Sequence, residues 1–268
     1  MYNNTELCVK TDNDTMTENF TSNIGVRQVD NLSPTLFKIF INDLIDSFDE
    51  SCKPAILNTL KLNCLLYADD LVIMSETADG LQMCIDKLYN YCTKWGLQIN
   101  MKKTKSVVFN NTGKLHDKIF NVNNVPIERA KGYKYLGVYL SSSGSSAEAK
   151  EDLYKRGLKA LLKFKKSFNL YKPKIKTLLH IFDHTVKPVL LYGSEVWGTS
   201  MVNKINKEER FLFNLNKNMK QEHVHIKFCK FSLGVGKRTT NIAVLGELGR
   251  YPFLLEVFKI YSGILNIY

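Results

Sequence analysis

Two adjacent carboxylates, Asp69 and Asp70, lie between two short apolar runs of the chain, residues 64–66 and 71–74. Apolar runs of this length that flank a polar pair are typical of buried strands, so we predict a β-hairpin with the aspartates at its tip. Carboxylate oxygens are ligands that Mg²⁺ prefers, and paired Mg²⁺ ions support nucleotidyl transfer. An ordinary turn is the alternative interpretation, because Asp is favoured in turns for backbone reasons.

Three further sequence blocks surround this hairpin in a defined order. The upstream block, residues 25–37, reads GVRQVDNLSPTLF, and the downstream blocks read GLQINMKKTK at residues 96–105 and YKYLGV at residues 133–138. Together with the Tyr-Ala-Asp-Asp hairpin, these blocks resemble the palm of reverse transcriptases from non-LTR retrotransposons, the LINE-like and jockey-like elements. The resemblance covers most of the chain from Gly25 onward, and residues 192–198 also resemble the region behind that polymerase core.

The resemblance implies synthesis of DNA on an RNA template, with attack of a primer 3′-hydroxyl on the α-phosphate of a deoxynucleotide. Asp69 and Asp70 would hold Mg²⁺ in a two-metal site. The implied partners are an RNA template, a DNA primer and a dNTP, with no obligate protein partner. The residues that the resemblance assigns to the nucleotide and template site are Gln28, Asp30, Leu32, Ser33, Pro34, Tyr67, Ala68 and Lys103. For Lys103, a lysine in an ordinary solvated basic turn is an equal alternative.

The chain also departs from the family pattern in two ways. Val29 follows Gln28 where the family usually has Gly, and its β-branched side chain fills space where nucleic acid approaches. The family carries a further aspartate on an earlier palm strand, but the nearest candidates, Asp12 and Asp14, lie in a polar stretch without a strand pattern. We therefore expect the fingers and the first catalytic strand to be missing, the Mg²⁺ site to be incomplete and this fragment to be inactive.

Two helices are predicted around the hairpin. Ser33 is expected to cap the first, with Pro34 at its first position, and its apolar stripe continues as far as Phe48. The second helix has apolar residues at helical spacing from Leu81 to Trp95, and Gly96 stands where a helix-terminating glycine is common.

Charge is distributed unevenly along the chain. Residues 1–100 hold 7 Lys and Arg against 14 Asp and Glu, whereas residues 101–268 hold 30 against 12, which gives net charges of −7 and +18. A basic half of this kind indicates binding to a phosphate backbone. The basic residues concentrate on a helix predicted over residues 147–170, where the polymerase family has a thumb, although a membrane-surface helix would share the pattern. The residues expected to contact the nucleic-acid backbone are Lys155, Arg156, Lys159 and Lys163.

These observations predict an α+β fold: a partial right-hand polymerase palm, an antiparallel sheet with helices, over residues 1–140. A basic helical thumb and a helical C-terminal region would occupy residues 141–268. A second hypothesis is a non-catalytic nucleic-acid-binding remnant of a retrotransposon. The six cysteines show no disulfide-framework spacing, and there is no signal peptide or membrane-spanning run, so we expect an intracellular protein of the nucleus or cytoplasm that is not secreted.

Overall fold

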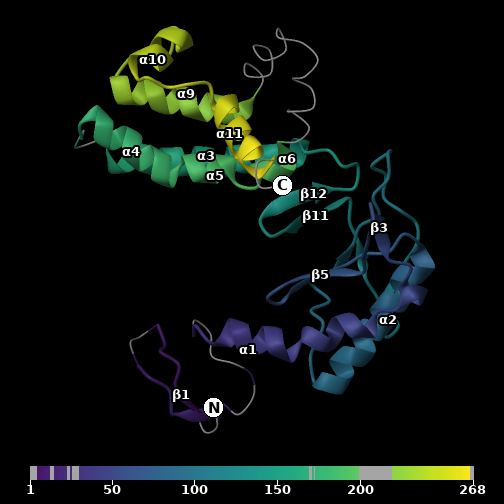
Figure 1. Cartoon of the computed structure of the whole chain (residues 1–268). Coiled ribbons are helices and arrows are strands. Elements are labelled where there is room, and N and C mark those ends of the chain that lie inside the picture. The colour runs from purple at the N-terminus through teal and green to yellow at the C-terminus, as the bar shows by residue number, and fades with distance from the viewer. Residues whose placement is uncertain are drawn as a thin grey trace. The chain divides into compact units, whose positions relative to one another are not determined.

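The computed structural model of the chain (Figure 1) describes residues 5–12, 15–22, 25, 30–168, 171, 173–198 and 219–265. The fold mixes helices with antiparallel strand pairs, which confirms the α+β prediction at that level. Two compact units are present. The first unit comprises Met1–Ser106 and Asp117–Glu128, and the second unit comprises Val107–His116 and Arg129–Tyr268.

The first unit contains short strand pairs around one long helix. Its hairpins pair β1 with β2, β3 with β4, β5 with β6 and β8 with β9, each antiparallel. The element bounds are β1 Thr5–Leu7, β2 Phe20–Ser22, α1 Ser33–Phe40, η1 Asn42–Ser47, η2 Glu50–Cys52, β3 Ala55–Leu57, β4 Leu60–Leu62, β5 Cys64–Tyr67, β6 Asp70–Ile73, α2 Ala78–Trp95, β7 Lys105–Ser106, β8 Asn121–Val122 and β9 Val125–Pro126, with β10 Glu128–Arg129 at the boundary.

Helix α2 organises this unit and matches the predicted helix closely. The Thr77 hydroxyl caps its first turn by accepting the N–H of Gly80 at 3.1 Å, and Gly96 ends the helix in the left-handed conformation at φ 67°. Gly80 also permits close packing, because a Cβ there would lie 2.6 Å from the Cys52 carbonyl oxygen. The helix therefore packs directly against the backbone of η2.

The helix predicted from Ser33 to Phe48 is shorter than expected. The α-helix ends at Phe40, and the chain then forms the 3₁₀ helix η1. Because side chains three residues apart share a face in a 3₁₀ helix, Ile41 and Leu44 are buried together, while Ile45 is 54% exposed. The prediction that the α-helical pattern continues to Phe48 was therefore wrong beyond Phe40.

The second unit is mainly helical, and a hairpin precedes its helices in the chain. Helix α3 packs against α5 and α9 (Figure 1), and the rings of Phe182 on α4 and Phe228 on α9 stack with centroids 3.8 Å apart. The predicted basic helix is α3, with Leu153, Leu161 and Phe164 buried as expected. The bounds are β11 Gly132–Tyr135, β12 Val138–Ser141, α3 Ala147–Ser167, α4 Ile175–Thr185, α5 Lys187–Leu191, α6 Ser194–Trp197, α9 Lys220–Leu233, α10 Asn241–Glu247 and α11 Phe253–Leu265.

The hairpin β11–β12 is attached to these helices through its turn. Leu136 and Gly137 form the turn with φ of 44° and 81°. The Tyr192 hydroxyl donates a hydrogen bond to the Leu136 carbonyl at 2.7 Å, and the Arg156 guanidinium donates one to the Gly137 carbonyl at 3.0 Å. The hairpin therefore belongs to the helical second unit, and the division of the chain into palm and thumb near residue 140 stays a prediction.

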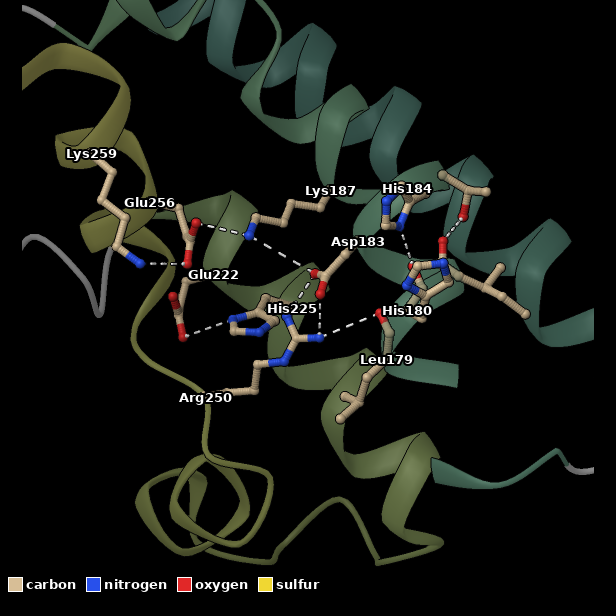
Figure 2. A network of polar contacts seen from close by, with 12 residues as sticks. Leu179, His180, Asp183, His184, Lys187, Glu222, His225, Arg250, Glu256 and Lys259 are labelled. Carbon is tan, nitrogen blue, oxygen red and sulfur yellow. Dashed lines mark hydrogen bonds and ion pairs between the residues drawn. The ribbon is translucent and has the colours of Figure 1, made fainter. Parts of the chain in front are cut away.

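A polar network joins α4, α5 and α11 in the second unit (Figure 2). The two terminal nitrogens of Arg250 donate to the two carboxylate oxygens of Asp183 at 2.7 and 2.8 Å, a bidentate pair that fixes both side chains. Lys187 pairs with Glu256 at 2.8 Å. Charged groups of opposite sign therefore compensate each other across three helices.

Glu222 on α9 anchors the start of α11. Its Oε2 accepts the buried backbone N–H of Phe253 at 2.5 Å, so a side chain from one helix satisfies the first donor of another. Burial raises the pKa of Glu222 to about 7, although the Phe253 hydrogen bond opposes that rise. The neighbouring His225 ring is also buried, and burial followed by the charges of Arg250 and Lys187 lowers its pKa to about 4.

No helix in the described part of the chain has the length and apolar character needed to cross a bilayer.

The contact between α3 and α5 gives a first prediction. A Cβ added at Gly157 would lie 2.2 Å from Cδ2 of Leu190, so Gly157→Ala should lower the free energy of unfolding by about 1–3 kcal/mol through overpacking. Gly246→Ala is the matched control, because no described atom lies within 4 Å of the new Cβ at that helical position. This change should raise the free energy of unfolding by about 0.5–1 kcal/mol. Urea unfolding measures both, and equal effects would contradict the packing argument.

A second prediction concerns the pH dependence of stability. The folded-state pKa of Glu222, about 7, lies above the ordinary value of 4.5, so its stabilising contribution is complete below pH 4.5 and is lost as the pH rises through 7. Glu222→Gln keeps the acceptor for Phe253 and removes the ionisation. As the pH rises from 4.5 to 8, the free energy of unfolding of this variant should increase relative to that of the wild type by up to about 3 kcal/mol.

Denaturant unfolding of both proteins across this pH range measures the difference. His225 acts oppositely, because its contribution is complete above pH 6.5 and is lost as the pH falls through about 4. The comparison with Glu222→Gln cancels this contribution. A difference that stays constant with pH would show that Glu222 is not protonated on burial.

Candidate active site and nucleic-acid surface

The hairpin β5–β6 places the aspartates at its tip, as predicted from the sequence. Tyr67 lies directly opposite Asp70, and Ala68 and Asp69 form the two-residue turn between them. Ala68 adopts φ 52°, a left-handed conformation that is uncommon for a side chain larger than glycine. A two-residue turn of this kind fixes the register of the hairpin and so fixes where the carboxylates emerge.

The inner face of the hairpin is bound to the core of the first unit. Cys64 pairs with Ile73 and Leu66 pairs with Leu71, and all four pack against a buried cluster. Successive strand residues point to opposite faces, so this burial directs Tyr67 and Asp70 outward. The cluster consists of Leu44, Phe48, Cys52, Cys84 and Tyr91.

The four residues at the tip are all exposed, with Tyr67 at 64%. Within the described residues, neither the Asp69 nor the Asp70 carboxylate accepts a hydrogen bond or forms an ion pair, so both carboxylates are available to an external cation. Their hard oxygen donors fit Mg²⁺. The described residues contain no group of three or more His, Cys, Asp or Glu side chains placed to share an ion, so this part of the chain offers the pair as a partial donor set.

The block that the resemblance assigns to the incoming nucleotide is described from Asp30 onward, and Gln28 and Val29 lie outside the described residues. The Asp30 carboxylate accepts the backbone N–H of Leu32 at 3.2 Å. Leu32 occupies the cap position of α1, where no side chain among the described residues provides a capping hydrogen bond.

The prediction that Ser33 caps α1 was therefore wrong, because Ser33 is the first residue of the helix. Its side chain is buried, and its hydroxyl has no hydrogen-bond partner among the described residues. Pro34 lies in the first turn, where its missing N–H costs nothing.

Lys103 is exposed in a turn that follows α2. Its backbone N–H donates to the Asn100 carbonyl at 3.0 Å, so the turn is closed by the backbone and the ammonium group extends into solvent. Lys105, two residues on, is instead paired with Glu128. Of the two, Lys103 is the one without a carboxylate partner among the described residues, so its ammonium group can meet a phosphate.

The four residues predicted to contact the nucleic-acid backbone all lie on helix α3, but they are of two kinds. Lys155, Lys159 and Lys163 are exposed at intervals of four residues on the face opposite the buried stripe, although Lys155 lies 3.8 Å from Glu151. Arg156 differs, because it pairs with Asp152 at 2.9 Å and donates to the Gly137 carbonyl. The structure therefore gives Arg156 an internal role in holding the hairpin β11–β12.

A second group of lysines was not identified from the sequence. Lys165 on α3 has its pKa lowered by burial, and the charges of Lys227 and Lys237 lower it further. Lys166 is exposed and extends the row on α3. Because Lys227 and Lys237 are 62 and 72 residues distant from Lys165 in the sequence, only the folded structure reveals this group.

A sequence model described as reverse transcriptase (RNA-dependent DNA polymerase) matches residues 3–140 of the chain. The chain is also 31% identical over 135 residues to the retrovirus-related Pol polyprotein from retrotransposable element R2DM of Drosophila melanogaster, and this alignment covers 47% of this chain and 13% of the relative.

Two further relatives from Drosophila melanogaster match a longer part of the chain. The RNA-directed DNA polymerase from mobile element jockey is 26% identical over 199 residues, and the probable RNA-directed DNA polymerase from transposon BS is 28% identical over 200 residues. Each alignment covers 68% of this chain and 20% or 21% of the relative, so the chain spans about a fifth of these proteins or less. Since the sequence model matches just over half of the 268 residues, the chain belongs to the reverse transcriptase family, of the kind encoded by non-LTR retrotransposons.

Proposed function

We propose that this chain contributes the carboxylate hairpin of a polymerase that copies an RNA template into DNA. The observation that carries the proposal is the tip of β5–β6, where Asp69 and Asp70 are exposed and unpaired within the described residues. Membership of the reverse transcriptase family supports the same activity. A turn that served only to reverse the chain would gain nothing from two adjacent unpaired carboxylates, since like charges repel.

In the proposed mechanism, Asp69 and Asp70 provide oxygen ligands for Mg²⁺. The bound ions would activate the primer 3′-hydroxyl and stabilise the leaving pyrophosphate. The packed inner face of the hairpin would keep both carboxylates in place, because burial of Leu66 and Leu71 resists movement of the strands. Tyr67, opposite Asp70, would provide an apolar wall for the nucleotide.

The remaining residues of the proposed site come from the resemblance. The segment from Gln28 to Pro34 would shape the template and nucleotide site, and Lys103 would lie near the triphosphate. The exposed ammonium group of Lys103 agrees with such a role. These assignments extend the proposal beyond the hairpin.

The exposed lysines of α3 would bind the sugar-phosphate backbone of the template and primer. Four residues of α-helix advance about 6 Å, so these exposed lysines form a row along α3 that can follow a phosphate backbone. The group around Lys165 would add to this surface, because an approaching phosphate would relieve the repulsion among its lysines. Binding would be sensitive to salt and largely independent of sequence.

The lysine surface also favours a second candidate, a nucleic-acid-binding remnant without catalysis. Its basic residues lie in the second unit, whereas the carboxylate hairpin lies in the first. Binding can therefore persist where catalysis does not. Catalytic and binding assays on the same variants separate the two candidates.

The catalytic proposal predicts the effect of removing one carboxylate. The assay uses a chimera in which the upstream fingers and palm of a close relative precede this chain, because the family relatives are much longer. Asp69→Asn keeps the size of the side chain but removes the charge that holds Mg²⁺. Primer extension on an RNA template should fall by about a hundredfold or more, since metal-borne charge stabilisation is worth several kcal/mol.

Asp46→Asn is the matched control, because Asp46 is an exposed aspartate of the same unit that belongs to η1 and not to the hairpin β5–β6. It should extend primers at the unmodified rate. The 268-residue chain alone should show little extension. A chimera unaffected by Asp69→Asn would exclude the hairpin as the catalytic centre, and strong extension by the isolated chain would overturn the expectation that its Mg²⁺ site lacks a ligand.

The binding proposal predicts how affinity depends on salt. Replacing Lys155, Lys159, Lys163 and Lys166 with Ala should weaken binding to an RNA/DNA hybrid. The negative slope of log affinity against log salt should become shallower by about 0.7–0.9 for each phosphate that the variant no longer neutralises. Arg156 is left intact, because its removal would release the hairpin β11–β12. Fluorescence anisotropy between about 50 and 200 mM salt, the interval in which several such contacts weaken binding by orders of magnitude, measures the slope.

The matched control replaces the same four lysines with Arg, which preserves each charge. This variant should keep the slope of the wild-type chain. Circular dichroism should show equal helix content in all three proteins, since the four positions lie off the buried face of α3. An unchanged slope in the Ala variant would exclude this face of α3 as the phosphate-binding surface.

A further inference from the structure

Two exposed histidines lie one helical turn apart on α4. His180 and His184 are four residues apart, and their ring centroids are separated by 4.2 Å with the planes tilted by 42°. Figure 2 shows the two rings side by side on the helix. Residues at this spacing project from the same face, so the rings can approach a common ligand.

A hydrogen bond determines which nitrogen of His184 is available. Its Nδ1 lies 2.8 Å from the carbonyl oxygen of His180. A carbonyl can only accept a hydrogen bond, so Nδ1 must carry the proton, and the lone pair of the neutral ring is then on Nε2. Metal-bound imidazoles commonly donate their second nitrogen to a carbonyl in this way, which fixes the ring and strengthens the ligand.

The helix between the two rings is held firmly on its other side. Leu178 and Phe182 are buried in the core of the second unit, and Asp183 is fixed by its bidentate pair with Arg250. The nearby Lys187 is compensated by Glu256. The two rings therefore lie on a rigid support, and the charges of Lys187 and Arg250 are balanced by carboxylates.

We propose that His180 and His184 form a two-imidazole site for a divalent transition-metal ion of the Cu²⁺, Ni²⁺ and Zn²⁺ class. Each of these ions accepts imidazole nitrogen, and an ion about 2.0–2.1 Å from each Nε2 can bridge rings that lie this close. Since no third donor is placed beside them within the described residues, water or a donor from a bound molecule completes the coordination.

This site is chemically distinct from the proposed Mg²⁺ site. Mg²⁺ takes oxygen ligands and binds imidazole poorly, whereas the histidine pair presents only nitrogen. Asp69→Asn should therefore leave the histidine site unchanged. Failure of either proposal would not affect the other.

Isothermal titration of the untagged full chain with CuCl₂, NiCl₂ and ZnCl₂ tests the proposal. The chain carries Cys8→Ser, because the exposed Cys8 thiol would itself bind these ions. One ion should bind to the histidine pair, most tightly for Cu²⁺, and MgCl₂ should give no signal at this site. The bound ion should also raise the unfolding temperature of the chain.

Three variants separate the pair from scattered histidines. His184→Ala should abolish the saturable binding. The double change His184→Ala with Thr185→His keeps two imidazoles but moves one about 100° around the helix, so binding should also be lost. His223→Ala removes a solitary exposed histidine on α9 and should change nothing. No saturable binding to the wild-type pair, or equal binding by all variants, would overturn the proposal.

Discussion

The burial of one face of the hairpin β5–β6 is the constraint on which the candidate active site depends. Side chains alternate between the two faces of a strand, so packing Leu66 and Leu71 inward leaves Tyr67 and Asp70 outward. A shift of register by one residue would reverse every side chain and bury a carboxylate. The cost of such burial without a partner is several kcal/mol or more, which keeps the hairpin in one register.

Helix α2 provides the surface that accepts this face. Its position is fixed at the start by the close approach of Gly80 to the Cys52 carbonyl and by the cap from Thr77. Ser75 links the same segments, since its hydroxyl donates to the Cys52 carbonyl oxygen at 2.8 Å. The position of the carboxylates at the hairpin tip thus depends on contacts between α2, η2 and the segment that follows β6.

The second unit uses its charges in two ways. Some are paired internally, as in the pairs of Arg250 with Asp183 and of Arg156 with Asp152, and Arg156 also donates to the Gly137 carbonyl of the hairpin β11–β12. Others, such as Lys159 and Lys163, face solvent without carboxylate partners among the described residues. The net positive charge of the sequence is therefore a poor guide to which residues meet a phosphate, because it counts both kinds alike.

Local pattern in the sequence determined the hairpin with its aspartates, helix α2 with its terminal glycine, the buried stripe of α3 and the membership of the reverse transcriptase family. Each depends on spacing between near neighbours, which period and turn chemistry encode directly. Tertiary structure decided the rest. Whether Ser33 caps or joins a helix, whether Arg156 faces a ligand or the Gly137 carbonyl, and which lysines surround Lys165 depend on partners distant in sequence. Such contacts exist only after the chain has packed, because the same residue types are compatible with either outcome until a neighbour is present.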